Sequence, residues 1–85
     1  GKKLLEIKTK TITNANIGSF GNIDLGLNIS NNMVLGVKLS NTAYASLPMI
    51  QNNYWFCYVI KNQAQTTLNL QTSGTVSATV YYVEY

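Results

Sequence analysis

A chain of 85 residues with a net charge of +3 is expected to form one small domain. All six basic residues are lysines, and four of them fall within the first ten residues, so the remainder is close to neutral. This distribution lacks the basic stripe that nucleic-acid binding requires. With no histidine, one cysteine and three carboxylates, the sequence also excludes an intrachain disulfide and a zinc cage and disfavours a calcium loop, so no metal or cofactor is expected.

The most apolar stretch of the chain, residues 54–60, is too short to cross a bilayer, which requires about 20 apolar residues. Asn53 and Lys61 bracket this stretch on either side. No membrane span is therefore expected. A domain of this size without disulfides has a small core, and association of several copies is a common route to extra stability.

Apolar and polar residues alternate with a period of two in four windows, at residues 5–13, 22–29, 33–40 and 76–83. Such alternation is typical of β-strands that bury one face and expose the other. No window has the convincing 3.6-residue period of an amphipathic helix. The residues expected on the inward faces are, in chain order, Leu5, Ile7, Thr9 and Thr11, then Ile23, Leu25, Leu27 and Ile29, then Met33, Leu35, Val37 and Leu39, and finally Val76, Ala78, Val80 and Tyr82.

Clusters of Gly, Asn and Ser separate these windows and predict turns. The short "SNN" at residues 30–32 predicts a hairpin between the strands that flank it. The "TSGT" at residues 72–75 predicts a second hairpin, which joins residues 68–70 to the last strand. Residues 41–47 are followed by Pro48 and predict a loop or a short strand. Further connections are expected at residues 16–22 and 61–65.

The pattern as a whole predicts an all-β fold, a small antiparallel β-sandwich, jelly-roll-like or barrel-like, with about six to seven strands. Residues 8–85 are expected to form this single domain. Residues 1–7 are expected to form an N-terminal arm or the end of a preceding stalk.

The stretch "YWFCYVI" at residues 54–60 is apolar on both faces of a strand. Such a strand is either central, with both faces covered, or has one face at a subunit interface. Cys57 lies among large apolar residues and is expected to be a buried structural thiol. A nucleophilic role is not expected, because no histidine is present to act as its base. Trp55 is expected in the core or at an interface, with sugar stacking as the alternative. The candidate residues for the interface of a homotrimer are Tyr54, Trp55, Phe56, Tyr58, Tyr81 and Val83.

Any contact with a glycan is expected in loops at one end of the sandwich, because the strands are committed to core and interface. The candidate loops are residues 14–22, 41–53 and 62–65, which are rich in Asn, Ser and Gln. Amide groups beside an aromatic face suit a neutral polysaccharide, although Asn also favours turns for its own backbone geometry. The candidate contact residues are Phe20, Tyr44, Asn52, Asn53 and Asn62.

Four segments resemble a small β-rich module at the C-terminal ends of tail and fibre proteins of phages and prophages of Gram-positive bacteria. These segments are "TITNANIGSFGNIDL" near the start, "MVLGVKLS", the aromatic "NYWFCYVI", and "TLNLQTSGTVSATVYYVEY" at the end. The resemblance implies a structural module of a virion or prophage, commonly trimeric, near the tip of a fibre. It brings no catalytic or binding residues with it.

Two functions follow as expectations. The first is a trimerising tip module of a phage or prophage tail or fibre protein that also contacts a host-surface glycan. The alternative is a carbohydrate-binding or adhesion module of a secreted or cell-surface protein, so the location is a virion or an extracellular surface in both cases. An enzyme is not expected, since Asp24 and Glu84 are the best available acid pair and each is more simply a solvated strand residue.

Overall fold

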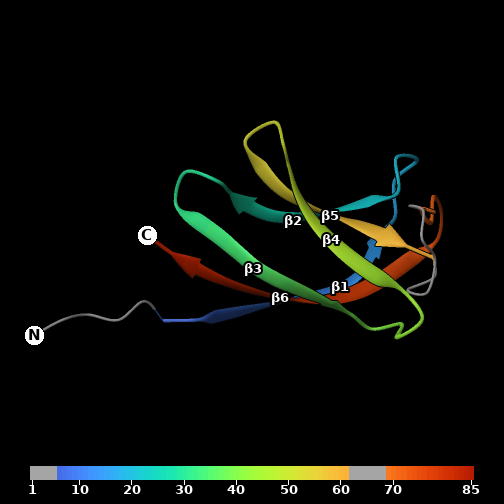
Figure 1. Ribbon diagram of the computed structural model, residues 1–85, viewed down its shortest axis with the longest axis horizontal. Helices are drawn as coiled ribbons and strands as arrows, with labels where there is room; N and C mark the ends of the chain where they lie inside the picture. Colours follow the sequence, from blue (N-terminus) through green and yellow to red (C-terminus); the bar gives the residue numbers. More distant parts are fainter. Residues whose placement is uncertain (1–5, 62–68) are drawn as a thin grey trace, which may run out of the picture.

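The computed structural model describes residues 6–61 and 69–85, and within them the chain forms six strands and no helix (Figure 1). One sheet has the strand order β1-β6-β3 and the other β2-β5-β4, with every pairing antiparallel. The predicted all-β sandwich is confirmed. The strands are β1 (Lys8–Asn16), β2 (Asn22–Asn28), β3 (Asn32–Leu39), β4 (Ala45–Gln51), β5 (Tyr54–Ile60) and β6 (Thr75–Glu84).

The core between the two sheets is built from alternate residues of β2, β5 and β6. In β5, Cys57 and Val59 are fully buried. The inward residues predicted for β2 as far as Leu27 and for most of β6 are confirmed, because alternate residues keep facing the core. The pairing of β2 with β5 shifts between Asp24 and Leu27, which leaves two extra residues, and an even number preserves the faces. These buried residues are Ile23, Leu25 and Leu27 in β2 and Val76, Ala78 and Val80 in β6.

In β3 the predicted inward face is wrong for the first half of the strand. The pairing with β6 shifts between Val34 and Gly36, which leaves Leu35 as an extra residue. A bulge of one residue exchanges the two faces of a strand, so the alternation before it is inverted. Val34 is therefore buried, whereas Met33 and Leu35 are 45% and 54% exposed, and Leu39 beyond the bulge is buried as predicted.

In β1 the predicted faces are also reversed over the described residues. Thr9 and Thr11 face solvent, and the side chains of Lys8 and Lys10 are partly covered. The Lys10 ammonium donates a hydrogen bond of 3.0 Å to the Leu25 carbonyl of β2. The aliphatic part of a lysine side chain can cover an open edge of a sandwich while its ammonium group forms hydrogen bonds at that edge. The prediction assumed that charged side chains point to solvent, and so it placed the lysines on the outer face.

Both predicted hairpins are wrong. The turn after β2 leads the chain into the opposite sheet, where β3 pairs with β6. Leu70 forms a bridge with Ile60 of β5 instead of pairing with β6. A polar turn has the same local composition whether the chain folds back on its neighbour or crosses to the other sheet, so these turns did not identify strand partners.

The hairpin that does form joins β4 to β5 through Asn52 and Asn53. Both residues have positive φ, 52° and 67°, as a two-residue type I′ turn requires, and Asn tolerates this region. Residues 45–51 form the edge strand β4. The sequence left residues 41–47 open as a loop or a short strand and counted residues 41–53 among the candidate loops. Pro48 is accommodated in β4 because an edge strand leaves one side without a ladder partner.

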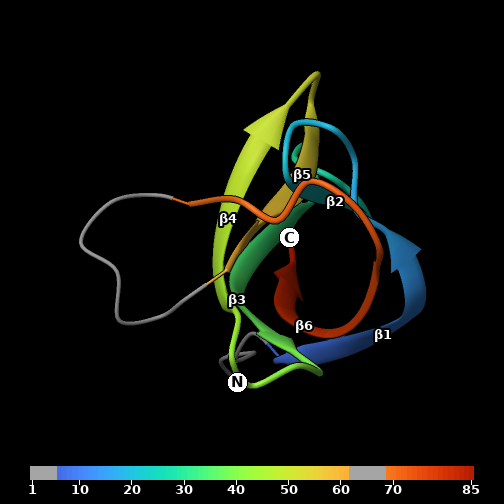
Figure 2. The same cartoon turned by 90° about the vertical axis from the view of Figure 1, so that its right-hand side faces the viewer.

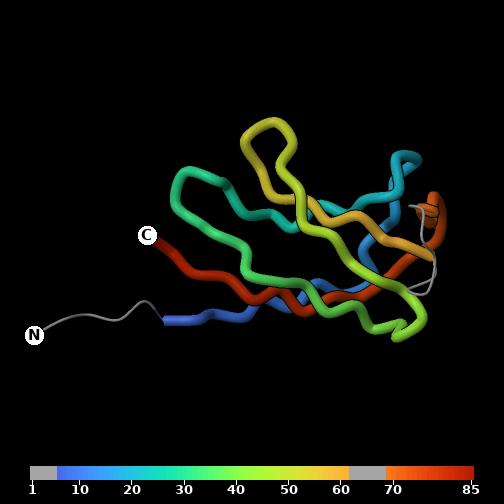
Figure 3. The backbone as a smooth tube through the Cα atoms, in the orientation of Figure 1, coloured from blue at the N-terminus to red at the C-terminus, as the bar shows by residue number. Residues whose placement is uncertain are grey.

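Seen along the strands, the two sheets curl toward each other into a barrel-like outline (Figure 2). On one side the Ser46 hydroxyl of β4 donates to the Val37 carbonyl of β3 at 2.6 Å. On the other side the Lys10 contact joins β1 to β2. The backbone trace shows the start of β1, the end of β6 and the β2–β3 turn at one end of the molecule (Figure 3). The β1–β2 and β3–β4 loops lie at the other end.

Candidate interaction surfaces

The outer side of the β2-β5-β4 sheet carries a band of apolar side chains. Direct antiparallel partners share a face. Phe56 pairs with Met49, and Tyr58 pairs with Leu47. Tyr54 and Leu47 are each 45% exposed, and the others are half-buried. We call this band the apolar outer face, and its members are Leu47, Met49, Tyr54, Phe56 and Tyr58.

The strand beside this face is polar and nearly uncharged. On β2, Asn22, Asp24 and Asn28 pair with the aromatic residues of β5. Among the described residues in these ladder rows, Asp24 is the single charged one, and its carboxylate accepts a hydrogen bond of 2.8 Å from the Gly26 backbone N–H. The apolar outer face therefore has a polar margin on β2 with little charge.

The structure separates the residues predicted for the oligomer interface into three environments. Tyr54, Phe56 and Tyr58 share the apolar outer face. Tyr81 lies on the outer side of the other sheet, and Val83 is buried. Trp55 packs against the core, and its indole N–H donates to the Asn32 carbonyl at 3.0 Å. The core alternative is thus the position that Trp55 adopts. Val83 pairs with the exposed Met33, so it lies on the same outer side as Tyr81, although its own surface is largely covered.

The residues predicted to contact a glycan do not gather at one end. Phe20 is 75% exposed in the β1–β2 loop, and Tyr44 is half-buried against the core beside the start of β4. The Asn52–Asn53 turn adjoins the Tyr54 end of β5, which pairs with the far end of β2. The β1–β2 loop and the Asn52–Asn53 turn have similar compositions, but the length of a strand separates them. Asn62 falls outside the described residues.

Cys57 is buried between the sheets, as predicted. Its thiol donates a hydrogen bond of 3.3 Å to the Tyr58 carbonyl. Burial raises the pKa of Cys57 to about 11, because the thiolate would lose its hydration. A hydrogen bond with the Leu47 backbone lowers the pKa and offsets only part of this effect. The thiol therefore stays protonated and unreactive near neutral pH.

Within residues 6–61 and 69–85 there is no cluster of three or more His, Cys, Asp or Glu side chains that could hold a metal ion.

The raised pKa of Cys57 predicts a loss of stability at alkaline pH. The neutral thiol is favoured in the folded state, so its contribution is complete below pH 9.0 and is lost as the pH rises toward about 11. We expect the free energy of unfolding of the wild type, minus that of Cys57→Ala, to fall by about 1.4 kcal/mol per pH unit in this window. Urea denaturation of both proteins across the range measures this difference, in which the shared lysines and tyrosines cancel.

A pH-independent difference between the two proteins would contradict this assignment. So would fast labelling of the native protein by a thiol reagent at neutral pH. Cys57→Ala itself is expected to cost about 1 to 2 kcal/mol through lost contacts.

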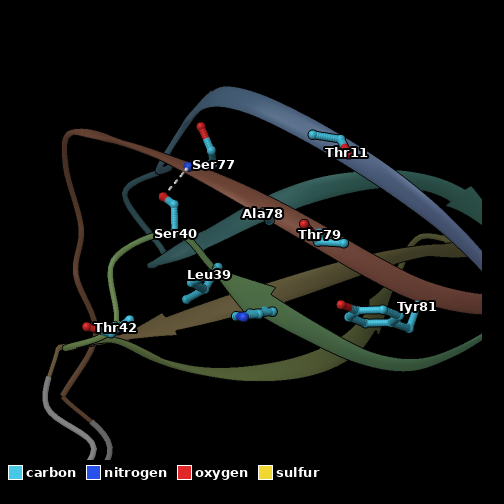
Figure 4. A pocket seen from close by; sticks show the side chains of 9 residues that line it. Thr11, Leu39, Ser40, Thr42, Ser77, Ala78, Thr79 and Tyr81 are labelled. Carbon is cyan, nitrogen blue, oxygen red and sulfur yellow. Dashed lines mark hydrogen bonds between the residues drawn. The ribbon is translucent and has the colours of Figure 1, made fainter.

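A second surface lies on the outer side of the β1-β6-β3 sheet and was not anticipated from the sequence. It is a shallow depression of about 420 Å³ to which all three strands contribute side chains (Figure 4). The alternation of hydroxyl residues at 9–13 and 75–79 is a signal from which it could have been found, but Thr9 and Thr11 were assigned to the inward face of their strand. The side chains that define it here are Thr11, Lys38, Ser40, Ser77, Thr79 and Tyr81.

Comparison with models of protein families, with curated proteins and with solved structures found no match for this chain. In the described part of the chain, no helix has the length and apolar character needed to cross a membrane. The two surfaces of the sandwich therefore carry the functional argument.

Proposed function

We propose that this domain is a non-catalytic assembly module that associates with two further copies of itself through the apolar outer face. Its proposed setting is the tip of a phage or prophage tail or fibre protein. The observation that carries the proposal is the band of Leu47, Met49, Tyr54, Phe56 and Tyr58 on the solvent side of a sheet. Antiparallel sheets usually present polar residues to solvent, and contiguous exposed apolar patches mark interaction sites.

A second copy of the chain is the partner that best suits this face. The ladder rows around it hold one charged residue, Asp24, which is occupied by a backbone N–H. Identical copies therefore meet with little charge repulsion. Among residues 6–61 and 69–85, the fully buried side chains are few and of modest size, such as Ile23, Val59 and Val80. Burial of further apolar surface between copies would add stability that a small core does not supply.

The placement of the strand ends is compatible with a tip. Lys8 at the start of β1 pairs with Tyr82 near the end of β6, so the chain enters and leaves at the same end of the molecule. A stalk joined at that end leaves the β1–β2 loop with Phe20 at the opposite, distal end (Figure 3). The phage setting and the number of three copies rest on the resemblance of segments such as residues 33–40 and 53–60.

Light scattering coupled to size-exclusion chromatography tests the proposal directly. The wild type is expected to have the mass of three chains at micromolar concentrations. Leu47→Lys is expected to weaken association at least about a hundredfold, because burial of an unpaired charge at the interface costs about 3 kcal/mol or more.

Leu35→Lys is the matched control, since Leu35 is an exposed leucine of β3 that lies outside the apolar outer face. Circular dichroism would establish that both variants remain folded. A monomeric wild type, or equal weakening by the two substitutions, would refute association through this face.

A further inference from the structure

The depression on the β1-β6-β3 sheet is built from three ladder rows. Thr79 of β6 pairs with Thr11 on one side and with Lys38 on the other. The next row has Tyr81 opposite Gly36, which has no side chain to fill the space beside the aromatic ring. In the other direction, Ser77 lies beside Ser40, whose backbone N–H donates to the Ser77 carbonyl at 2.8 Å.

Two hydroxyl groups in this depression are held in place by backbone donors. The Ser40 oxygen accepts a hydrogen bond of 3.2 Å from the Ser77 backbone N–H, drawn in Figure 4. The Ser77 oxygen accepts one of 3.0 Å from the Asn14 backbone N–H. Each hydroxyl still has its own hydrogen, which it can donate to a ligand oxygen, and a second lone pair.

The charge of the depression has one sign. Lys38 is exposed and lines it, whereas no carboxylate does. The nearest acid along β6, Glu84, forms an ion pair of 3.3 Å with Lys8. This lining favours a ligand that supplies oxygen acceptors and a negative charge.

Tyr81 adds an apolar surface to this donor-rich site. Its side chain is on the outer side of β6, where the residue is 38% exposed, and Figure 4 shows the ring at one end of the depression, with Thr79 next along. A flat aromatic ring can stack on the apolar face of a pyranose, while hydroxyls bind the ring substituents.

We propose that this depression binds an anionic saccharide, a pyranose that carries a carboxylate or a phosphate. Lys38 pairs with the charged group, Ser40 and Ser77 donate to oxygens, and Tyr81 stacks on the sugar ring. The inference goes beyond the proposed assembly role and does not depend on it, because the depression and the apolar outer face belong to different sheets. One site of this size and openness is expected to bind weakly, with a Kd of about 1 mM.

The test is titration of the ¹⁵N-labelled protein, followed by NMR, with three probes of matched length. These are a neutral oligosaccharide, one that contains a hexuronate and one that carries a sugar phosphate. Saturable shifts are expected at the backbone amides of Lys38, Ser77 and Thr79 with an anionic probe. Lys38→Gln is expected to weaken that binding about tenfold, as loss of a charge-assisted hydrogen bond would. Comparison of the two anionic probes identifies the charged group that the site prefers.

Two control variants make the result specific. Lys61→Gln removes an exposed lysine outside the depression and should leave binding unchanged. Ser40→Ala, which removes a hydroxyl that the proposal makes a donor to the ligand, should weaken binding, whereas Ser73→Ala outside the depression should not. Leu47→Lys should bind as the wild type does, so failure of assembly and failure of this site are distinguishable.

Three outcomes would overturn the proposal. The first is the absence of saturable shifts with both anionic probes. The second is binding of the neutral probe as tight as that of the anionic probes and unaffected by Lys38→Gln. The third is a set of shifts confined to the loops of Phe20 and Asn52.

Discussion

Replacement of Trp55 by alanine is expected to lower the free energy of unfolding by about 3 to 5 kcal/mol. The indole packs against the core and is the largest side chain in contact with it, so its removal leaves a cavity that rigid strands cannot close. It also ties the two sheets together, since its N–H donates to the Asn32 carbonyl of β3 from β5. For a domain whose total stability is about 5 to 15 kcal/mol, this loss is a large share.

Chemical denaturation of Trp55→Ala and Trp55→Phe separates the contribution of core packing from that of the indole hydrogen bond. Trp55→Phe retains most of the apolar volume and is expected to cost about 1 to 3 kcal/mol, mainly because the Asn32 carbonyl loses its donor. The alanine variant should therefore lose clearly more stability than the phenylalanine variant. Equal and small losses in both variants would mean that Trp55 is not part of the core.

Gly21→Ala is expected to cost about 2 to 4 kcal/mol, because two penalties coincide at this position. Its φ is +76°, which alanine adopts at a cost. An added Cβ would lie 2.5 Å from the Cβ of Leu70, a contact that requires the backbone to move. The Gly21 carbonyl also accepts a hydrogen bond of 2.8 Å from the Val59 N–H, so the backbone is held where the collision occurs.

Two other glycines serve as controls for Gly21→Ala. Gly74 has a φ of +91° but open space around it, so Gly74→Ala should show the conformational cost alone, about 1 to 2 kcal/mol. Gly36 has neither a positive φ nor a close neighbour, so Gly36→Ala should change stability by less than about 1 kcal/mol. Thermal and urea unfolding of the three variants should follow this order. A cost at Gly21 equal to that at Gly74 would show that Leu70 moves aside.

The candidate surfaces were only partly predictable from the sequence. The aromatic stretch at residues 54–60 indicated that one face of a strand would be available for a partner, and three of its residues lie on the apolar outer face. The assignment of Trp55 to core or interface stayed open because period-two alternation defines two faces without saying which is inside when both are apolar. The hydroxyl depression was missed because its residues come from three strands that are distant along the chain, at positions 11, 38–40 and 77–81.

The sequence by itself determined the all-β class, the buried faces of β2 and most of β6, and the burial of Cys57. The class and the buried faces follow from the pleat of a single strand, which places alternate side chains on opposite sides. The burial of Cys57 follows from the large apolar residues that surround it in the sequence. Only the tertiary structure decided that β2 and β3 belong to different sheets, that β6 lies between β1 and β3, and that a bulge turns Met33 and Leu35 to solvent. Strand partners are selected by contacts between residues far apart in the chain. A bulge depends on the strand opposite, so neither leaves a periodic signal in a local window of sequence.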